Sequence, residues 1–270
     1  MTTTWLDRPS GRLAYELTGD PAGPLIVLSP GFGDLRSTFD QLAPRLAADG
    51  VRVVTTDLRG HGESSTGWDD YSVASVAGDL LALIHAHGGR GVLFGNSYSG
   101  SAAVVAAARE PAAVAGLVLA GAFVRDPQGS ALKKALFALF RPTVPGRFLW
   151  TAAAWPSFFK ARPADFAARK AELTRNLHRP HGYEAVGWIS AHGSHAATEP
   201  RLPDVPAPAL VIMGTKDPDF PDPAAEARFT ADHLGGPAEV VLVDGVGHYP
   251  QTEAVDAVAP AVIEFARKVS

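Results

Sequence analysis

The chain has 270 residues, of which 46% are hydrophobic and 19% charged, a composition typical of one large globular domain or of one domain with an insertion. A formal net charge of −4, with no strongly basic run, predicts neither a nucleic-acid partner nor a segment that binds membrane surfaces. The absence of cysteine excludes disulfides, thiolate metal sites and a cysteine nucleophile.

The N-terminal stretch carries Asp7, Arg8 and Arg12 and has no apolar region of the kind found in signal peptides. Nowhere do about 18 apolar residues follow one another, which is the length a membrane-spanning helix needs. We therefore expect a cytoplasmic protein that is neither exported nor embedded in a membrane.

From residue 12 onward, short apolar runs alternate with longer helical patterns, the order expected of βαβ units. The predicted strands are nearly all apolar, as strands covered on both faces should be. They span residues 25–28, 51–56, 91–94, 116–120, 209–213 and 239–243. The predicted helices span residues 39–48, 73–87, 99–109, 223–234 and 253–268. Residues 12–17 alternate and are expected to pair antiparallel at one edge of a mainly parallel α/β sheet.

Between residues 123 and 208 this alternation stops, and the segment becomes helical in pattern, interrupted by prolines and rich in aromatic residues. Its bulky aromatic residues are Phe137, Phe140, Phe148, Trp150, Trp155, Phe158, Phe159, Phe166 and Trp188. We expect residues 1–122 and 209–270 to form the core, and residues 123–208 a helical cap. Some cap rings should wall an apolar substrate pocket, with Trp155, Phe159 and Trp188 as candidates, while the others pack the cap's own core.

The most informative chemical signal lies at residues 95–99 (Gly-Asn-Ser-Tyr-Ser), where a predicted strand meets a predicted helix. A serine in a tight strand-to-helix turn projects its hydroxyl above the sheet. The backbones crowd there, so the turn needs small residues two positions before and two after the serine. Gly95 and Ser99 meet this need, and Ser97 is therefore the predicted nucleophile. Ser99 and Ser101 are alternatives, but both fall on the helix after the turn.

A serine hydroxyl needs a base to take its proton, and an acid to orient that base. His248 stands in a glycine-rich loop directly after the last predicted strand, and Asp217 follows the strand before it. Open α/β sheets build their sites at the carboxyl ends of their strands. The chain order Ser, Asp, His therefore predicts a triad of Ser97, Asp217 and His248. Other candidate acids are Asp126, Asp219 and Asp222.

The remaining histidines are expected to have no catalytic role. Those on the glycine turn or on predicted helices are expected to be surface or structural residues: His61, His85, His87 and His233. Those in the cap are His178, His181, His192 and His195. The cap histidines are loosely spaced and lack carboxylates at ligand spacing, so we expect no metal site and no cofactor.

With these residues, the sequence resembles the α/β-hydrolase superfamily over nearly its whole length, in the branch that has a serine nucleophile and an inserted cap. Residues 30–34 (P-G-F-G-D) stand where such proteins carry an H-G-x loop, and residues 57–64 (D-L-R-G-H-G-E-S) are similar to the family's D-x-R-G-x-G-x-S turn. The resemblance implies that the backbone N–H groups of Phe32 and Tyr98 form an oxyanion hole. It also implies that Asp57 and Arg59 tie loops together beneath the site.

Two positions depart from the family pattern. Pro30 replaces the histidine of the H-G-x loop, so the hydrogen bonds that anchor this loop must come from elsewhere. Ser99 replaces the second glycine of the elbow, as in hydrolase-like hormone receptors that retain the triad but turn over slowly. The level of activity is therefore left open.

The resemblance implies a carboxylesterase-like serine hydrolase that cleaves an ester or related acyl bond of a small to medium, largely apolar substrate. A hydroxyl at Ser97 argues against haloalkane dehalogenases and epoxide hydrolases, which use a carboxylate at that position. Three alternatives stay open: a hydrolase of C–C bonds in ring-fission products, a cofactor-free perhydrolase or haloperoxidase, and a receptor for a small ligand. The expected partner is a small-molecule substrate, and the sequence predicts no particular oligomeric state.

Overall fold

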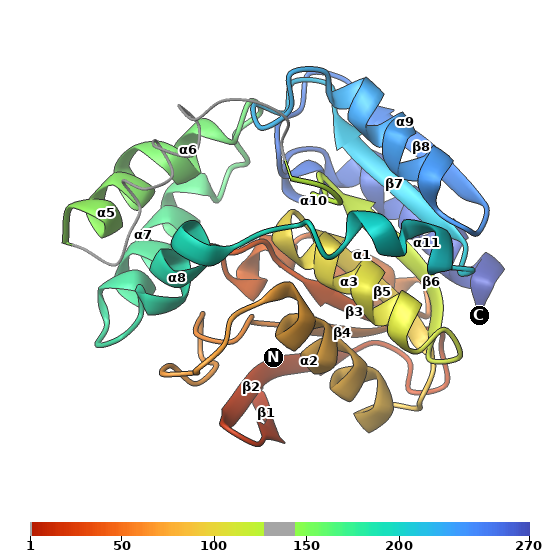
Figure 1. Cartoon of the computed structure of the whole chain (residues 1–270), viewed down its shortest axis with the longest axis horizontal. Helices are drawn as coiled ribbons and strands as arrows, with labels where there is room; N and C mark the ends of the chain where they lie inside the picture. Colours follow the sequence, from red (N-terminus) through yellow and green to blue (C-terminus); the bar gives the residue numbers. More distant parts are fainter. Residues whose placement is uncertain (1, 127–143) are drawn as a thin grey trace.

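The computed structural model describes residues 2–126 and 144–270, and it has an eight-stranded sheet at its centre (Figure 1). The strands are β1 (Thr4–Arg8), β2 (Gly11–Thr18), β3 (Leu25–Ser29), β4 (Arg52–Thr56), β5 (Gly91–Asn96), β6 (Val114–Ala120), β7 (Ala209–Gly214) and β8 (Ala238–Val243). Their order in the sheet is β1-β2-β4-β3-β5-β6-β7-β8. Strands β3 to β8 are parallel to one another, whereas β1 and β2 pair antiparallel. This arrangement confirms the predicted α/β-hydrolase fold.

Helices cover both faces of the sheet because alternate side chains of each inner strand point to opposite sides. Val27 and Leu93 belong to the apolar cluster on one face, while Ile26 and Phe94 belong to the cluster on the other. The first face is covered by α2 (Val73–Ala86), α3 (Tyr98–Arg109) and α9 (Pro223–His233). The second face is covered by α1 (Leu42–Ala48) and α11 (Val255–Val269). Strands β3 to β7 are therefore buried on both faces, whereas the edge strand β8 is partly exposed.

The predicted antiparallel pairing of residues 12–17 is confirmed, but the predicted position at the edge was wrong. The segment corresponds to β2, and β1 pairs outside it, with Arg8 opposite Gly11 across a turn at residues 9–10. The sequence signal of β1 was missed because this outer strand is largely exposed and carries charged residues in place of an apolar run.

Two predicted helices are each divided in the structure. The pattern at residues 39–48 resolves into a short 3-10 helix, Arg36–Phe39, followed by α1. The pattern at residues 253–268 resolves into α10 (Pro250–Glu253) and α11, with Ala254 in a non-helical conformation (φ −143°, ψ 51°) between them. Proline fits the first turn of a helix because it lacks an N–H group, so Pro250 favours a separate start for α10.

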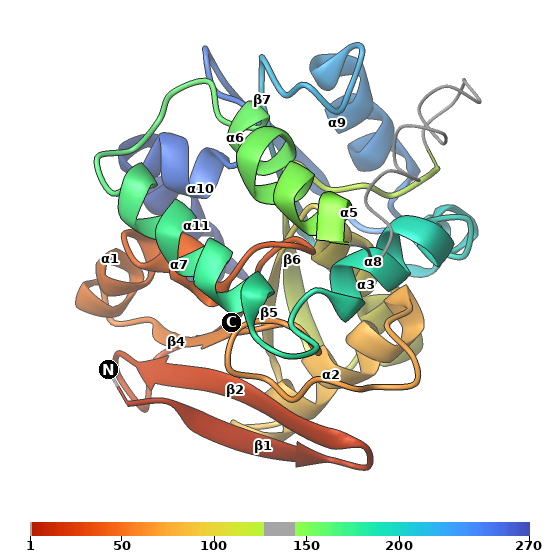
Figure 2. The same cartoon turned by 90° about the vertical axis from the view of Figure 1, so that its left-hand side faces the viewer.

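Residues 123–208, here called the insertion, leave the sheet between β6 and β7, which are neighbouring strands. The helical parts described are α5 (Val144–Leu149), a π-helical turn (Trp150–Ala154), α6 (Trp155–Ser157), α7 (Phe166–His178), α8 (Glu184–His192) and a 3-10 helix (Glu199–Asp204). Figure 1 shows α5 to α8 grouped at one end of the molecule, and Figure 2, which faces that end, shows α5, α6 and α7 in front of the strands. The aromatic residues Phe137 and Phe140 lie outside the described residues.

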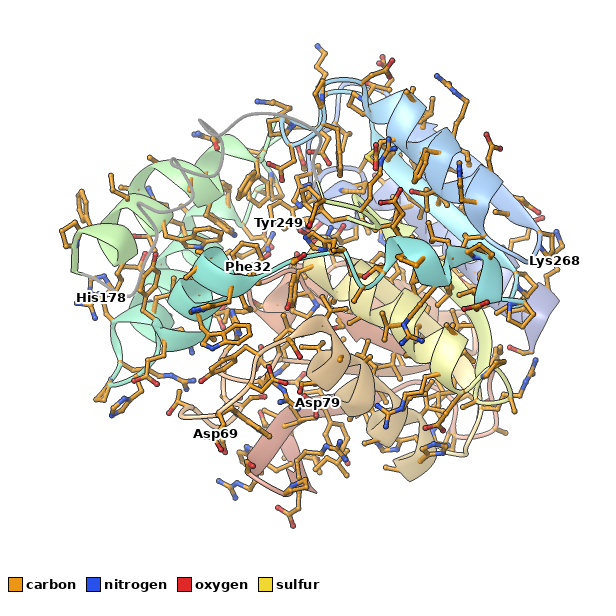
Figure 3. The ribbon with its side chains drawn as sticks, viewed as in Figure 1. Phe32, Asp69, Asp79, His178, Tyr249 and Lys268 are labelled. Atoms are coloured by element: carbon orange, nitrogen blue, oxygen red, sulfur yellow. The ribbon has the colours of Figure 1, made fainter. Side chains whose placement is uncertain are left out.

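The insertion packs onto the rest of the chain through a shared apolar cluster. Trp150, Trp155 and Phe159 of the insertion lie in this cluster with Leu35 and Tyr249 from loops at the sheet. Figure 3 places Phe32 and Tyr249 at the junction between the insertion and the sheet. No helix within residues 2–126 and 144–270 has the length and apolar character needed to cross a bilayer.

Candidate active site

Ser97 is the single residue between the end of β5 at Asn96 and the start of α3 at Tyr98. Its φ of 55° and ψ of −120° are strained for a residue with a side chain, as in the nucleophile turn of α/β hydrolases. Serine often caps a helix N-terminus, but the Ser97 side chain makes no such cap with α3. The Ser97 hydroxyl is therefore left available for another partner.

The residues around the turn explain its small-residue pattern. A Cβ atom on Gly95 would lie 2.5 Å from the Ser99 carbonyl oxygen, so a larger residue would collide with the backbone. The Ser99 side chain is fully buried, and its hydroxyl lies 2.7 Å from the Ser29 carbonyl oxygen. The Ser101 hydroxyl bonds the Phe123 carbonyl and lies 2.7 Å from Nδ1 of His195. Both alternative serines are thus engaged in structural hydrogen bonds.

His248 and Asp217 lie together after β8 and β7. Nδ1 of His248 is 2.7 Å from Oδ2 of Asp217, and both residues are 2% exposed. Oδ1 of Asp217 accepts the backbone N–H of Asp219 at 3.0 Å, which holds the carboxylate in orientation. Oδ2 of Asp219 lies 3.5 Å from the same histidine nitrogen. Asp222, the third candidate acid on this loop, instead caps α9 through the N–H of Ala225.

Contacts of Asn96 and Phe123 place His248 beside the serine turn. Nδ2 of Asn96, the residue before Ser97, donates to the Ala120 carbonyl at 2.8 Å and to the His248 carbonyl at 3.2 Å. The N–H of Phe123 donates to the Ser97 carbonyl at 3.4 Å, and the Phe123 ring lies 6.0 Å from the His248 ring. The structure therefore brings the ends of β5, β7 and β8 to one place.

Opposing effects act on the pKa of His248. Burial lowers it, but the negative charges of Asp217 and Asp219, together with the hydrogen bond to Asp217, raise it to about 9. The imidazolium form of His248 is thus stabilised by the carboxylates that face it. Such an arrangement favours a histidine that gains a proton during a reaction.

The insertion contacts the loop that carries His248. The His248 N–H donates to the Phe158 carbonyl at 3.0 Å, and the rings of the two residues are 5.4 Å apart. Oε2 of Glu253 accepts the N–H groups of Lys160 and Ala161, each at 2.7 Å, and that of Gly247 at 3.2 Å. One carboxylate therefore joins the insertion to the residue before His248.

The loop of residues 31–34 lies against the serine turn. A Cβ atom on Gly31 would stand 2.9 Å from Cβ of Ser97, so only glycine permits this approach. The Phe32 ring lies 5.9 Å from the Tyr98 ring and 5.1 Å from the Trp150 ring. The two residues predicted to supply oxyanion donors, Phe32 and Tyr98, are thus neighbours.

His61 anchors this loop in the absence of a histidine at position 30. Its Nε2 accepts the Gly33 N–H at 2.8 Å, so Nδ1 carries the proton and donates to the Arg59 carbonyl at 3.0 Å. Burial lowers the pKa of His61 to about 4, against raising effects from the Arg59 carbonyl and the Asp57 charge. A neutral His61 is what this pair of hydrogen bonds requires.

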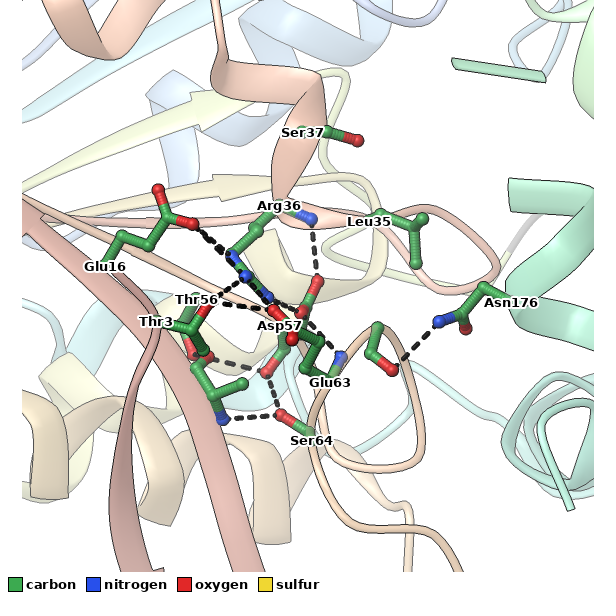
Figure 4. Close-up of polar contacts among 12 residues, drawn as sticks. Thr3, Glu16, Leu35, Arg36, Ser37, Thr56, Asp57, Glu63, Ser64 and Asn176 are labelled. Atoms are coloured by element: carbon green, nitrogen blue, oxygen red, sulfur yellow. Dashed lines mark hydrogen bonds and ion pairs between the residues drawn. The ribbon is translucent and has the colours of Figure 1, made fainter. Parts of the chain in front are cut away.

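The turn that carries His61 is held by ionic contacts (Figure 4). Asp57 accepts the backbone N–H groups of Arg36 at 2.8 Å and Glu63 at 3.0 Å, and it also pairs with the Arg36 guanidinium. Arg59 pairs with Asp79 through Nε at 2.7 Å and Nη2 at 2.8 Å. Asp57 and Arg59 tie loops together, as expected from the sequence.

The three predicted pocket residues lie in different surroundings. Trp155 and Phe159 are buried. The ring centroid of Trp155 lies 5.2 Å from that of Phe166, and the ring centroid of Phe159 lies 4.7 Å from that of Tyr249. The ring of Trp188 lies 5.8 Å from that of Tyr71. The rings beside His248 include two partly exposed side chains that were not among the three named pocket candidates, those of Phe123 and Phe158.

The other candidate acid, Asp126, has its hydrogen-bond partners within the insertion. Asp126 accepts the Ser194 hydroxyl at 2.8 Å and the His195 N–H at 2.6 Å, so it fastens a loop of the insertion. Burial lowers the pKa of His195 to about 4, and its ring stacks on Phe123 at 5.2 Å. Within the described ranges, the one group of side chains spaced to hold a metal ion is Asp217, Asp219 and His248.

Comparison with known proteins shows similarity to hydrolases in both sequence and structure. A model of the alpha/beta hydrolase family matches residues 26–261. A probable esterase of Oryza sativa subsp. japonica is 27% identical over 257 residues, covering 92% of this chain and 93% of that protein. The enol-lactonase from Burkholderia xenovorans superposes with a TM-score of 0.82 at 26% identity, over 98% of this chain and 100% of that one.

A thermophilic esterase from Thermogutta terrifontis superposes with a TM-score of 0.80 at 25% identity, over 100% of this chain and 99% of that one. These likenesses extend over nearly whole chains, so they cover the insertion as well as the sheet. Because the family model spans most of the 270 residues, the chain belongs to the α/β-hydrolase family.

Proposed function

We propose that this hydrolase is a carboxylesterase-like serine enzyme that cleaves an ester or related acyl bond of a small to medium, largely apolar substrate. The observation that carries the proposal is the buried His248–Asp217 pair, 2.7 Å between Nδ1 and Oδ2, beside the strained turn of Ser97. Together these groups have the donors and acceptors that acyl transfer needs. The esterase and enol-lactonase relatives support the same class of reaction.

In the proposed reaction, the Ser97 oxygen attacks the substrate carbonyl while its proton passes to Nε2 of His248. Asp217 keeps the other nitrogen of the ring protonated and stabilises the imidazolium. The backbone N–H groups of Phe32 and Tyr98 bind the oxygen that becomes negative, a contribution of roughly 3–4 kcal/mol for each donor. His248 then protonates the leaving alcohol, and a water activated by the same base releases the acid from Ser97.

We further propose that residues 123–208 act as a cap over Ser97, with a wall of aromatic side chains around the substrate. Phe123 and Phe158 support this because both rings are partly exposed and lie within 6.0 Å and 5.4 Å of the His248 ring. Trp155, Phe159 and Trp188 would shape the wall from behind, since Trp155 and Phe159 are buried and Trp188 packs on Tyr71. An apolar acyl group fits such a wall.

A fluorophosphonate probe should label Ser97 covalently, because the activated oxygen attacks phosphorus as it would attack a carbonyl. Peptide mass spectrometry of the labelled protein should locate the adduct on Ser97, and Ser97→Ala should remain unlabelled. An adduct on Ser99 or Ser101 in the folded protein would overturn the assignment of the nucleophile. Labelling without turnover of any p-nitrophenyl ester would favour a receptor for a small ligand.

Phe158→Ala should shift the acyl-chain preference toward longer chains, because removing the ring enlarges the space beside His248. We expect the kcat/KM ratio of p-nitrophenyl octanoate to acetate to rise by about tenfold or more, since single methylenes in a pocket change kcat/KM at least that much. The backbone carbonyl that accepts from His248 is retained in this variant.

Phe148→Ala is the matched control for this change. It removes another phenylalanine ring of the insertion, one that is 65% exposed, and should leave the chain-length profile unchanged. An unaltered profile in Phe158→Ala would place the acyl pocket elsewhere.

A ring-fission dienoate tested beside the esters distinguishes C–C hydrolysis from ester cleavage.

A further inference from the structure

Trp150 occupies the point where the insertion meets the loop of residues 31–34. It is 1% exposed, and its indole Nε1–H donates to the Gly33 carbonyl at 2.9 Å. Its ring lies 5.1 Å from the Phe32 ring and 6.2 Å from the Phe158 ring. Phe158 in turn lies 5.4 Å from His248. One side chain of the insertion therefore contacts both the proposed oxyanion loop and the ring packed on the proposed base.

The backbone of Gly33 is held from both sides. His61 accepts its N–H at 2.8 Å, while Trp150 donates to its carbonyl at 2.9 Å. Gly33 has a φ of +70°, and a Cβ atom there would stand 2.2 Å from Cζ2 of Trp150. The glycine thus permits the indole to approach the backbone. The first bond orients the peptide group between residues 32 and 33, and the second orients the one between residues 33 and 34. Both peptide groups directly follow the one that carries the Phe32 N–H.

Local helix geometry at Trp150 is also unusual. The residue begins the π-helical turn Trp150–Ala154, which interrupts the α-helical course between α5 and α6. Such turns are rare and occur frequently at functional sites, where they shift side chains relative to a regular helix. This observation is independent of the hydrogen bond to Gly33.

We propose that Trp150 is a positioning residue for the oxyanion hole, acting through the Gly33 carbonyl on the direction of the Phe32 N–H. The insertion, with His61 on the opposite side, would supply the anchoring that Pro30 cannot. The inference rests on the proposed serine-hydrolase function and adds a role for the insertion beyond substrate contact. Oxyanion binding would require the insertion to be seated on the loop.

Trp150→Phe tests this proposal because it removes the indole N–H and retains an aromatic ring. With p-nitrophenyl acetate, we expect kcat to fall by about tenfold and KM to change by less than about twofold, since the loss falls on the transition state. A trifluoromethyl ketone forms a tetrahedral oxyanion adduct with a serine. Its inhibition constant should rise by about the same tenfold factor, while that of the matching methyl ketone should stay constant.

The matched control is Trp68→Phe. Trp68 is also buried and also donates its indole N–H to a backbone carbonyl, that of Ser65 at 2.5 Å. It should lower Tm without changing kcat or the trifluoromethyl ketone affinity. If Trp150→Phe does not fold, β-(3-benzothienyl)alanine at position 150 gives a second test, because it places sulfur where the indole N–H stands and keeps the shape.

Wild-type kcat and wild-type trifluoromethyl ketone affinity in a folded variant at position 150 would overturn the proposal. So would a raised KM with unchanged kcat, which indicates a substrate wall instead. The outcome is distinguishable from failure of the proposed function, because full esterase activity in Ser97→Ala would reject the nucleophile itself, whatever Trp150 does.

Discussion

His248→Ala is expected to lower kcat for p-nitrophenyl esters by roughly 10⁴-fold or more, because the Ser97 proton then has no acceptor. His248 is 2% exposed, and its Nδ1 lies 2.7 Å from the Asp217 carboxylate, so the carboxylate orients this imidazole. Steady-state kinetics with active-site titration by the fluorophosphonate would measure the loss. The residual rate should be close to that of Ser97→Ala, since the groups act as a unit.

His85→Ala is the matched control for this experiment. His85 also pairs with a carboxylate, through Nε2 and Glu110 at 2.8 Å, but its side chain is 52% exposed on α2. It should retain wild-type kcat. A folded His248→Ala protein with kcat within about tenfold of wild type would reject general-base catalysis by this residue.

Much of the fold could be predicted from the pattern of apolar runs. The inner strands are covered on both faces, so β5 and β7 are nearly all apolar and their positions were predicted within about two residues. The edge strand β1 was missed because exposure removes that signal. Periodicity also could not reveal the break at Ala254, since a single non-helical residue hardly changes the pattern of apolar positions.

The candidate site was predictable to the extent that its residues stand at strand ends. Ser97, Asp217 and His248 each follow a predicted strand, and parallel strands bring their carboxyl ends together. The contacts of His61 and Trp150 with Gly33 join residues 28 and 117 positions apart in the chain, and no local pattern encodes such an approach. The departure at Pro30 was the one sequence signal that the loop needed another anchor.

Asp217→Asn is expected to lower kcat by about 10³- to 10⁴-fold, because an amide in place of the carboxylate no longer selects the correct tautomer of the base. In the protein, Nδ1 of His248 donates to Oδ2 of Asp217. An asparagine can present its NH₂ group there, which would leave the proton on Nε2, the nitrogen that must accept from Ser97. It also removes the charge that stabilises the imidazolium.

The same substitution should move the pH dependence. His248 acts as a base only when neutral, and its pKa is raised to about 9 by Asp217 and Asp219 against the lowering effect of burial. Wild-type kcat/KM should therefore rise with pH toward that value. Without the Asp217 charge, burial lowers the pKa of His248 with less opposition. The rise of kcat/KM with pH should therefore occur at lower pH, and the maximum kcat/KM should be smaller.

Asp126→Asn separates this assignment from its alternative at the end of β6. Among the described residues, Asp126 bonds Ser194 and His195 and makes no contact with His248. Asp126→Asn should therefore leave both the maximum of kcat/KM and the pH at which kcat/KM rises near their wild-type values. The test is to measure kcat/KM of Asp217→Asn and Asp126→Asn from about pH 5 to pH 10, the range in which a histidine can titrate. A large loss in Asp126→Asn with near wild-type turnover in Asp217→Asn would transfer the role of the acid to Asp126, which follows β6. If kcat/KM of Asp217→Asn rises at the same pH as that of the wild type, another group sets the pKa of the base.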